Sequence, residues 1–514
     1  MRLFFLALVL LCSFIAINAQ NVDQNLDKYW QYRHKLATEY MLIGDQQGYS
    51  LPASYINPGL ERMKWSDNTI WLGWYMGTLA TEYHLLHNPR YQGYADGDSA
   101  RISANINELH YALKAIIRLD STAETSFTWN ASCGIPNSRN GFFIRDDVPA
   151  NYTDSFPGYN FVDADFVEQN FANEMSQDQV YHVLLGLSLI KKFIPDTLVV
   201  NGFNIHNEAV EQSRLIGQWV HQDGWIIKNP ACGNKDVDRG PDVTLLAKGF
   251  NSALNYISDG TQDYSADVSG TATFIWDQTL INPSAFVNVD NLHMTLALAA
   301  IGEGWGSATL NNMMTIAESN RWYAYPLLYI ALRDTNAVTN YAQHKQLMRF
   351  WSDSMLNEAP ITGPLSTYPN QNGHGYGVNN RFIRPRANHY AGINANEEGH
   401  QWNGLDYMLL HNLQLIVDPN KWPVEDTTGI AALPVIKATL YPNPATHTVL
   451  IATNTNTLIT VQLFDLAGKE VVRQMLENGS GEFPLHYLEA GTYMVRITDN
   501  QGQQTTQRLM LLGR

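Results

Sequence analysis

The segment Val180–Ile194, VYHVLLGLSLIKKFI, is apolar on nearly every side of the helix that it predicts. A helix without a polar face is normally enclosed by other elements instead of lying on the surface. Other segments repeat apolar residues at spacings of three and four, the pattern of helices with one buried face. The clearest of these lie at residues 102–116, 245–257 and 405–416. Together the two patterns predict inner helices covered by outer ones.

Further helices are expected in the same part of the chain, which gives roughly ten in all. They are Tyr29–Met41, Asp67–His87, Ile205–Val220, Leu292–Ile301, Leu310–Leu332 and Tyr341–Met355. Strand patterns are sparse before residue 418, and no repeat of fixed length is visible, which disfavours a regular solenoid. We therefore predict that residues 20–417 form a mainly α domain, an α/α toroid of helical hairpins in two layers. Its loose resemblance to α/α-toroid carbohydrate-active proteins is a likeness of fold class alone.

Residues 418–438 break every periodicity and contain Pro419 and Pro423, which predicts a linker. The chain then changes character, because short apolar runs such as 449–451 and 461–464 alternate with turn residues. This pattern is typical of a small antiparallel β-domain. Residues 439–514 are therefore expected to form a β-sandwich behind the helical domain.

Three motifs in this tail occur in a fixed order: Tyr441–Pro444 at its start, Phe464–Gly468 as an aromatic-Asp-x-x-Gly turn, and Leu488–Tyr493 as Leu-x-x-Gly-x-Tyr. The tail thereby resembles the C-terminal sorting domain of proteins exported by the type IX secretion system of Bacteroidetes. The resemblance implies contact with the outer-membrane secretion machinery, passage through the periplasm, removal of the tail, and a secreted or cell-surface protein. It implies nothing about the chemistry of the preceding domain.

The N-terminal residues agree with export. Arg2 precedes an apolar run over residues 3–17, and Ala19 stands at the expected cleavage position, which predicts a signal peptide over residues 1–19. A lipoprotein anchor at Cys12 is disfavoured because Leu11 occupies the place of a small residue. No later segment has the roughly 18 uninterrupted apolar residues of a membrane span, so none is expected in the mature chain.

Composition limits the classes of partner and cofactor that the protein is expected to bind. The 514 residues carry a formal net charge of −16, which disfavours nucleic acid as a partner. Cys133 and Cys232 would be the only thiols left in an oxidising compartment, so they form either a disulfide or two separate buried thiols. They are too few for a structural zinc site. Asp236, Asp238 and Asp242 alternate as in a calcium loop, but no glutamate closes it, so at most a structural ion is expected and no catalytic metal or other cofactor.

The first candidate site precedes the helix predicted at Asp67–His87. Glycoside hydrolysis needs an acid and usually a second carboxylate, set among aromatic rings. Asp67 is the candidate catalytic acid or base here, and Trp65, Trp71 and Trp74 are candidate substrate-binding rings. In the alternative interpretation Asp67 is only a helix N-cap and the tryptophans belong to the core.

The second candidate site precedes the enclosed helix. Asp178 lies in the polar stretch 174–179, and we predict that it lines the same pocket as Asp67 and forms the second half of the carboxyl pair. Alternatively, Ser176 caps the helix and Asp178 interacts only with its first turn. Upstream, the adjacent acids Asp146 and Asp147 could hold a carboxyl proton or a cation, although such pairs are more often only solvated.

The third candidate is the long polar segment 372–402, in which Arg386, His389 and Tyr390 are candidate substrate-binding residues. The same residue types would suit proton abstraction from a uronic acid, so a polysaccharide lyase stays open behind a glycoside hydrolase. No HExxH, GxSxG or phosphate-loop motif is present, which disfavours metalloprotease, serine-hydrolase and nucleotide chemistry. The expected partner is a polysaccharide or other glycan. The alternative function is a non-catalytic glycan-binding or adhesion protein at the cell surface.

Overall fold

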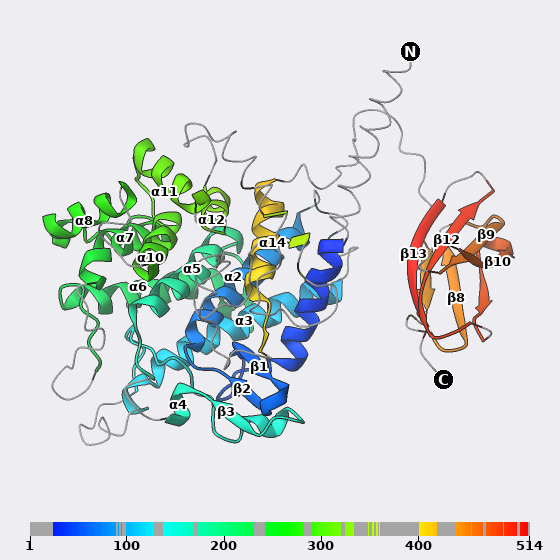
Figure 1. Cartoon of the computed structure of the whole chain (residues 1–514), viewed down its shortest axis with the longest axis horizontal. Helices are drawn as coiled ribbons and strands as arrows, with labels where there is room; N and C mark the ends of the chain where they lie inside the picture. The colour runs from blue at the N-terminus through cyan, green and yellow to red at the C-terminus, as the bar shows by residue number, and fades with distance from the viewer. Residues whose placement is uncertain are drawn as a thin grey trace, which may run out of the picture. The chain divides into compact units, whose positions relative to one another are not determined.

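The computed structural model divides into two compact units, Met1–Pro423 and Val424–Arg514 (Figure 1). Within them the structure describes residues 24–88, 91, 94, 99–126, 137–168, 173–230, 242–281, 289–319, 324–333, 348, 352–353, 356–357, 359, 400–418, 438–441, 443, 445–453, 455–465, 469–486, 488–500 and 504–511. The predicted signal peptide lies outside these residues, as does nearly all of the predicted linker. No helix in the described ranges is both long and apolar enough to cross a membrane.

The first unit is mainly helical, as predicted. Besides a helix over residues 24–39, the α-helices within its described residues are α2 (Asn68–His87), α3 (Ser99–Ser121), α4 (Asp165–Glu168), α5 (Gln177–Phe193), α6 (Ile205–Gln222), α7 (Asp242–Ile257), α8 (Gly270–Ile281), α10 (Val289–Ile301), α11 (Ser307–Ser319), α12 (Ala324–Leu332) and α14 (Leu405–Val417). The helix expected at Tyr341–Met355 falls largely outside the described residues.

The single helix expected over Leu310–Leu332 is two helices, α11 and α12. Pro326 lies in the first turn of α12, where its missing N–H has no helical acceptor to lose. Residues 320–323, between the two helices, lie outside the described residues. Apolar periodicity alone does not separate the two helices.

Contacts between successive helices lead from α2 to α14, and α14 in turn packs against α2. α2 packs against α5, α5 against α7, α7 against α10, α10 against α12, α12 against α14, and α14 against α2. Further helices cover this group: α3 packs on α2, α6 on α5, α8 on α7, and α11 on α8 and α12. α5 is buried from Gln179 to Ile190 and α12 along its whole length. The prediction that Val180–Ile194 is an enclosed helix is therefore confirmed.

α2 and α5 approach each other closely because glycines face each other across the contact. A Cβ atom on Gly73 would lie 2.2 Å from the carbonyl oxygen of His182, and one on Gly186 would lie 2.4 Å from that of Gly73. Further along, Gly77 faces Leu185 and Leu189, so the two helices run in the same direction. Only glycine permits such an approach of two backbones. The first turns of α2 and α5 are therefore neighbours.

A small sheet adjoins these helix starts. Its strands are β1 (Tyr55–Asn57), β2 (Arg62–Lys64), β3 (Phe161–Asp163) and β6 (Gln401–Trp402), in the order β3-β2-β1-β6. A separate two-stranded ladder joins β4 (Val199–Val200) and β5 (Phe203–Asn204). Strands of two or three residues are too short for a period-two pattern, which is why the sequence did not predict them. β2 leads directly into α2 and β6 into α14, so the sheet fixes where both helices begin.

The second unit is strand-rich, as predicted. β7 (Ala438–Tyr441), β8 (Thr448–Thr453) and β11 (Ser480–Pro484) form one sheet, and β9 (Ile459–Phe464), β10 (Glu470–Leu476), β12 (Gly491–Asp499) and β13 (Gln504–Leu511) form the other. Alternate side chains of β9 are buried, as expected of a strand with one solvated face. Both sheets contribute side chains to a single apolar core that includes Val449, Phe483 and Val495.

Candidate functional site

Asp67 occupies the position just before α2 and has φ 59°, in the left-handed region. For a residue with a Cβ this conformation costs about 1–2 kcal/mol. The carboxylate of Asp165 accepts a hydrogen bond from the Asp67 backbone N–H at 2.8 Å, which helps to hold the turn. The Asp67 side chain makes no capping bond to α2, so the helix-cap interpretation accounts for its position but not for its side chain.

The Asp67 carboxylate faces Arg145 and Gln179. Arg145 donates to Oδ1 at 2.5 Å as an ion pair, and the Gln179 amide donates to the same oxygen at 3.1 Å. Arg145 is itself oriented by the carbonyl oxygen of Glu174, at 2.7 Å from its Nε. The Asp67 side chain is 31% exposed. It is therefore a fixed carboxylate that solvent can reach.

Asp178 lies beside this carboxylate, in the first turn of α5. Its Oδ1 accepts hydrogen bonds from the Gln179 N–H, at 3.0 Å, and from the hydroxyl of Ser176. Ser176 makes no capping bond to the helix, so the alternative cap is not formed. Burial is the main cause that raises the pKa of Asp178, and the charge of Asp67 raises it further. The two predicted carboxyls are thus close enough for the charge of Asp67 to act on Asp178, and the side chain of Gln179, the residue after Asp178, donates to Asp67.

Two further acids support this arrangement, although the sequence did not single out the first. Asp165 lies 3.8 Å from Arg145, and burial raises its pKa to about 6. Asp146 is fully buried and accepts hydrogen bonds from the N–H groups of Asp165 and Phe166, at 2.8 and 3.3 Å. Burial, followed by the charge of Asp165, raises the pKa of Asp146 well above its usual value. Asp146 therefore organises the loop that carries Asp165.

The expectation that Asp146 and Asp147 are solvated was wrong. Asp147 is 5% exposed, and its carboxylate pairs with Arg118 at 2.6 Å and accepts from the Gly48 N–H at 2.9 Å. Each acid therefore has its own set of donors on a different side of the loop. Adjacency in sequence says nothing about such donors, because they come from distant segments.

Basic side chains lie at the edge of the same region. Arg62 and Lys64 of β2 both contact the carboxylate of Asp163, and Lys64 does so at 3.4 Å. His400 stacks on the ring of Tyr55, with centroids 3.8 Å apart. Burial lowers the pKa of His400 to about 4, and the charges of Arg62 and Lys64 contribute. His400, one of the described residues of the polar segment 372–402, therefore lies on β1, which pairs with the strand β2 that leads to Asp67.

The predicted aromatic lining is not formed by the tryptophans. Trp65 and Trp74 are fully buried and Trp71 is 2% exposed. The indole N–H groups of Trp65 and Trp74 donate inward, to the carbonyl oxygen of Leu51 at 3.0 Å and to Nδ1 of His182 at 2.9 Å. A sugar ring cannot reach side chains in this position, so we correct their assignment to core residues.

Several predicted residues lie outside the described part of the chain: Arg386, His389, Tyr390, Cys133, Cys232, Asp236 and Asp238. Asp242 is the first residue of α7. Among the described residues, no group of three or more His, Cys, Asp or Glu side chains could hold a metal ion. The residues that sequence reasoning missed as site members are Arg145, Asp165 and Gln179. The only available signal for Arg145 was a basic residue beside two acids in a polar loop.

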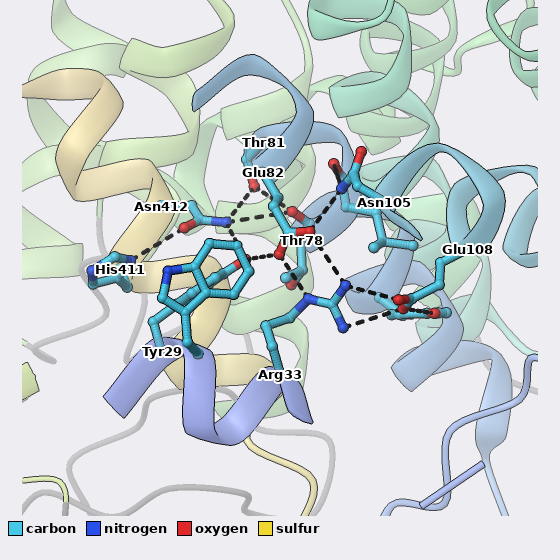
Figure 2. Close-up of polar contacts among 12 residues, drawn as sticks. Tyr29, Arg33, Thr78, Thr81, Glu82, Asn105, Glu108, His411 and Asn412 are labelled. Carbon is cyan, nitrogen blue, oxygen red and sulfur yellow. Dashed lines mark hydrogen bonds and ion pairs between the residues drawn. The ribbon is translucent and has the colours of Figure 1, made fainter. Parts of the chain in front are cut away.

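A second polar cluster lies inside the helical unit and is closed to solvent (Figure 2). Arg33, from the helix at residues 24–39, pairs with Glu82 of α2 at 2.7 Å and with Glu108 of α3 at 3.2 Å. Tyr29 donates to Glu82 and accepts from Asn412 of α14 at 3.1 Å. The cluster joins four helices from distant parts of the sequence. Its burial indicates a structural role.

Comparison with known families identifies the tail. Residues 439–511 match the family described as the secretion system C-terminal sorting domain. No curated protein matches the chain. The match coincides with the strand-rich unit and its three motifs. Residues 439–511 are thus a C-terminal sorting domain of the type IX secretion system, and the protein is exported to the cell surface or beyond it.

Proposed function

We propose that the helical domain is a carbohydrate-active enzyme of the glycoside hydrolase type, and that Asp67 and Asp178 are its catalytic pair. The observation that carries the proposal is that these acids lie at the starts of α2 and α5, where the charge of Asp67 acts on Asp178 and the Gln179 side chain donates to Asp67. The Asp67 side chain is partly exposed, so a substrate in solution can reach it. Two carboxyls in unlike surroundings are the groups that this reaction requires.

The two environments suggest separate roles. Asp178, whose pKa is raised, is the general acid that donates its proton to the glycosidic oxygen as the bond to the anomeric carbon breaks. Asp67, whose carboxylate pairs with Arg145, either removes a proton from the attacking water or attacks the anomeric carbon itself. Hydrolysis then adds one water across the broken bond. Gln179 fixes the orientation of the Asp67 carboxylate.

The proposed architecture is the two-layer α/α toroid. Its support is the order of packing, which runs from α2 through α5, α7, α10, α12 and α14 and returns to α2; α5 packs in addition against α10 and α12. In such a toroid the starts of the inner helices surround one end of the ring. Asp67 and Asp178 lie at two of these starts, and His400 lies just before a third. Arg386, His389 and Tyr390, which precede His400 by 10 to 14 residues in the sequence, remain the proposed substrate-binding residues.

The test is to incubate the purified chain with neutral and uronic-acid polysaccharides and to identify the products by mass spectrometry. We expect oligosaccharides that each carry one added water. Products with unsaturated ends would instead establish a lyase and transfer attention to His389 and Tyr390. Binding of a glycan without any product would overturn the enzymatic proposal and favour a surface glycan-binding protein.

A further inference from the structure

A hollow of about 420 Å³ lies between α7, α8 and the start of α11, and it shares no residue with the carboxyl pair. Its lining consists of Lys248, Asp277, Gly304, Trp305, Gly306, Ala308, Thr309 and Asn312. The size falls within the range of roughly 300–1,000 Å³ that is usual for small-molecule sites. The hollow therefore has room for a small-molecule ligand.

The aromatic residue of the lining, Trp305, is fixed in place by contacts with buried residues. The Trp305 ring stacks on that of Trp276, with centroids 5.5 Å apart and an interplanar angle of 23°. Trp276 is 1% exposed and fits because Gly249 leaves it space, since a Cβ there would lie 2.3 Å from the indole. The N–H of Trp305 donates to the Ala299 carbonyl oxygen at 2.9 Å. Trp305 therefore presents apolar ring surface to the hollow.

The polar part of the lining is balanced in charge. Lys248 and Asp277 form an ion pair at 2.7 Å, and both side chains keep substantial exposure, 29% and 45%. Thr309 and Asn312 add a hydroxyl and an amide, which both donate and accept hydrogen bonds. A Cβ on Gly304 or Gly306 would meet nothing within 4 Å, so the entrance is open. Such a lining suits an uncharged ligand that is rich in hydroxyl groups.

We propose that this hollow binds a sugar unit of a neutral glycan, as a site separate from the carboxyl pair. The apolar face of a pyranose ring would pack on Trp305, while its hydroxyls would bond to Asp277, Lys248 and Asn312. Binding here does not depend on catalysis at Asp67. A chain bound at this site would be held against the domain whether or not it is cleaved.

The test uses the full chain with Asp67→Asn, so that a bound glycan is not consumed. Soluble tetrasaccharides of glucose, xylose and mannose serve as probes, and hydrogen exchange of residues 303–312 reports binding at the hollow itself. Ala308→Trp fills the hollow from an exposed position and leaves the core intact. Ala104→Trp, on an exposed position of α3, is the matched control.

We expect one of the tetrasaccharides to protect residues 303–312, Ala308→Trp to weaken that binding at least tenfold, and Ala104→Trp to leave it unchanged. Asn312→Ala should weaken it as well, without the added bulk. No protection by any probe, or equal protection in Ala308→Trp, would overturn the proposal. Product release by the unsubstituted chain reports separately on the carboxyl pair, so failure of one proposal does not conceal failure of the other.

Discussion

Asp67 combines a left-handed backbone with a carboxylate that two side chains hold in place. Strained backbone at a non-glycine residue persists when surrounding contacts fix it, and such residues gather at functional sites. Here the contacts come from Arg145, Gln179 and the Asp165 carboxylate. The sequence pointed to Asp67 and Asp178 because acids at helix starts are visible as a pattern. It could not reveal Arg145 or Asp165, since their proximity depends on tertiary contacts.

Asp165 allows a pH test of this arrangement. Its pKa is raised from 3.8 to about 6, so the folded state holds the proton more tightly than the unfolded chain. The resulting stabilisation is fully present below about pH 4 and is lost as the pH rises through 6, a total of about 3 kcal/mol. Asp165→Asn cannot ionise but can still accept from the Asp67 N–H.

We therefore expect the free energy of unfolding of Asp165→Asn, relative to the unsubstituted chain, to rise between pH 4 and pH 7. Urea unfolding at the two pH values measures this difference. If the difference in unfolding free energy between the two proteins did not change with pH, the surroundings of Asp165 would not favour its neutral form.

At the scale of the elements, the contact between α2 and α5 brings the carboxyls together, and it depends on glycine. The sequence predicted both helices well, because long apolar periodicity is a strong signal. It did not predict which helices touch, and the short strands β1, β2, β3 and β6 gave no signal at all. The role of Gly73 becomes visible only in the structure, since it requires the backbone of His182, 109 residues further along the chain.

Gly73→Ala tests this contact. The added methyl group would lie 2.2 Å from the His182 carbonyl oxygen, so α2 and α5 must separate. We expect a loss of about 3 kcal/mol or more in unfolding free energy, as for overpacked cores, together with loss of glycan cleavage. Gly270→Ala, where a Cβ meets nothing within 4 Å, is the control and should change stability by less than about 1 kcal/mol. Equal stability of the two variants would contradict the proposed contact.

The buried cluster around Arg33 should stabilise the packing of the first helix against α2 and α3. Arg33→Met would leave Glu82 and Glu108 without their cation, and removal of one partner from a buried pair costs about 3–5 kcal/mol. Lys114→Met, which breaks an exposed pair with Asp45, should cost less than about 1 kcal/mol. Denaturant unfolding compares the two. Similar small losses would indicate that water reaches the Arg33 cluster.

At the scale of the whole molecule, the chain joins a helical domain to a sorting tail, and the two have separate tasks. The tail was predictable in detail because its three motifs are local in sequence and specific. The helical domain was predictable only in class, since the order of helix packing and the location of a site depend on contacts between distant residues. The 45% hydrophobic content of the whole chain and the helical periodicity of this domain are shared by many unrelated proteins.

Deletion of residues 439–514 tests the division between the two units. Each unit has its own apolar core, so the helical domain should remain folded without the tail. We expect the truncated protein to accumulate in the periplasm of a host with the type IX system, measured by cell fractionation and circular dichroism. Normal surface display or release of the truncated protein would show that the tail is not needed for sorting.

The most direct test of catalysis by the carboxyl pair is the rate of product release from a cleaved glycan by three variants. Asp67→Asn and Asp178→Asn should each lower the rate by about 100-fold or more, because positioned acids and bases contribute about 10²–10⁴ to such reactions. Asp154→Asn, at an exposed carboxyl, should leave the rate unchanged. Equal rates for all three variants, with the folds intact, would contradict the assignment of Asp67 and Asp178.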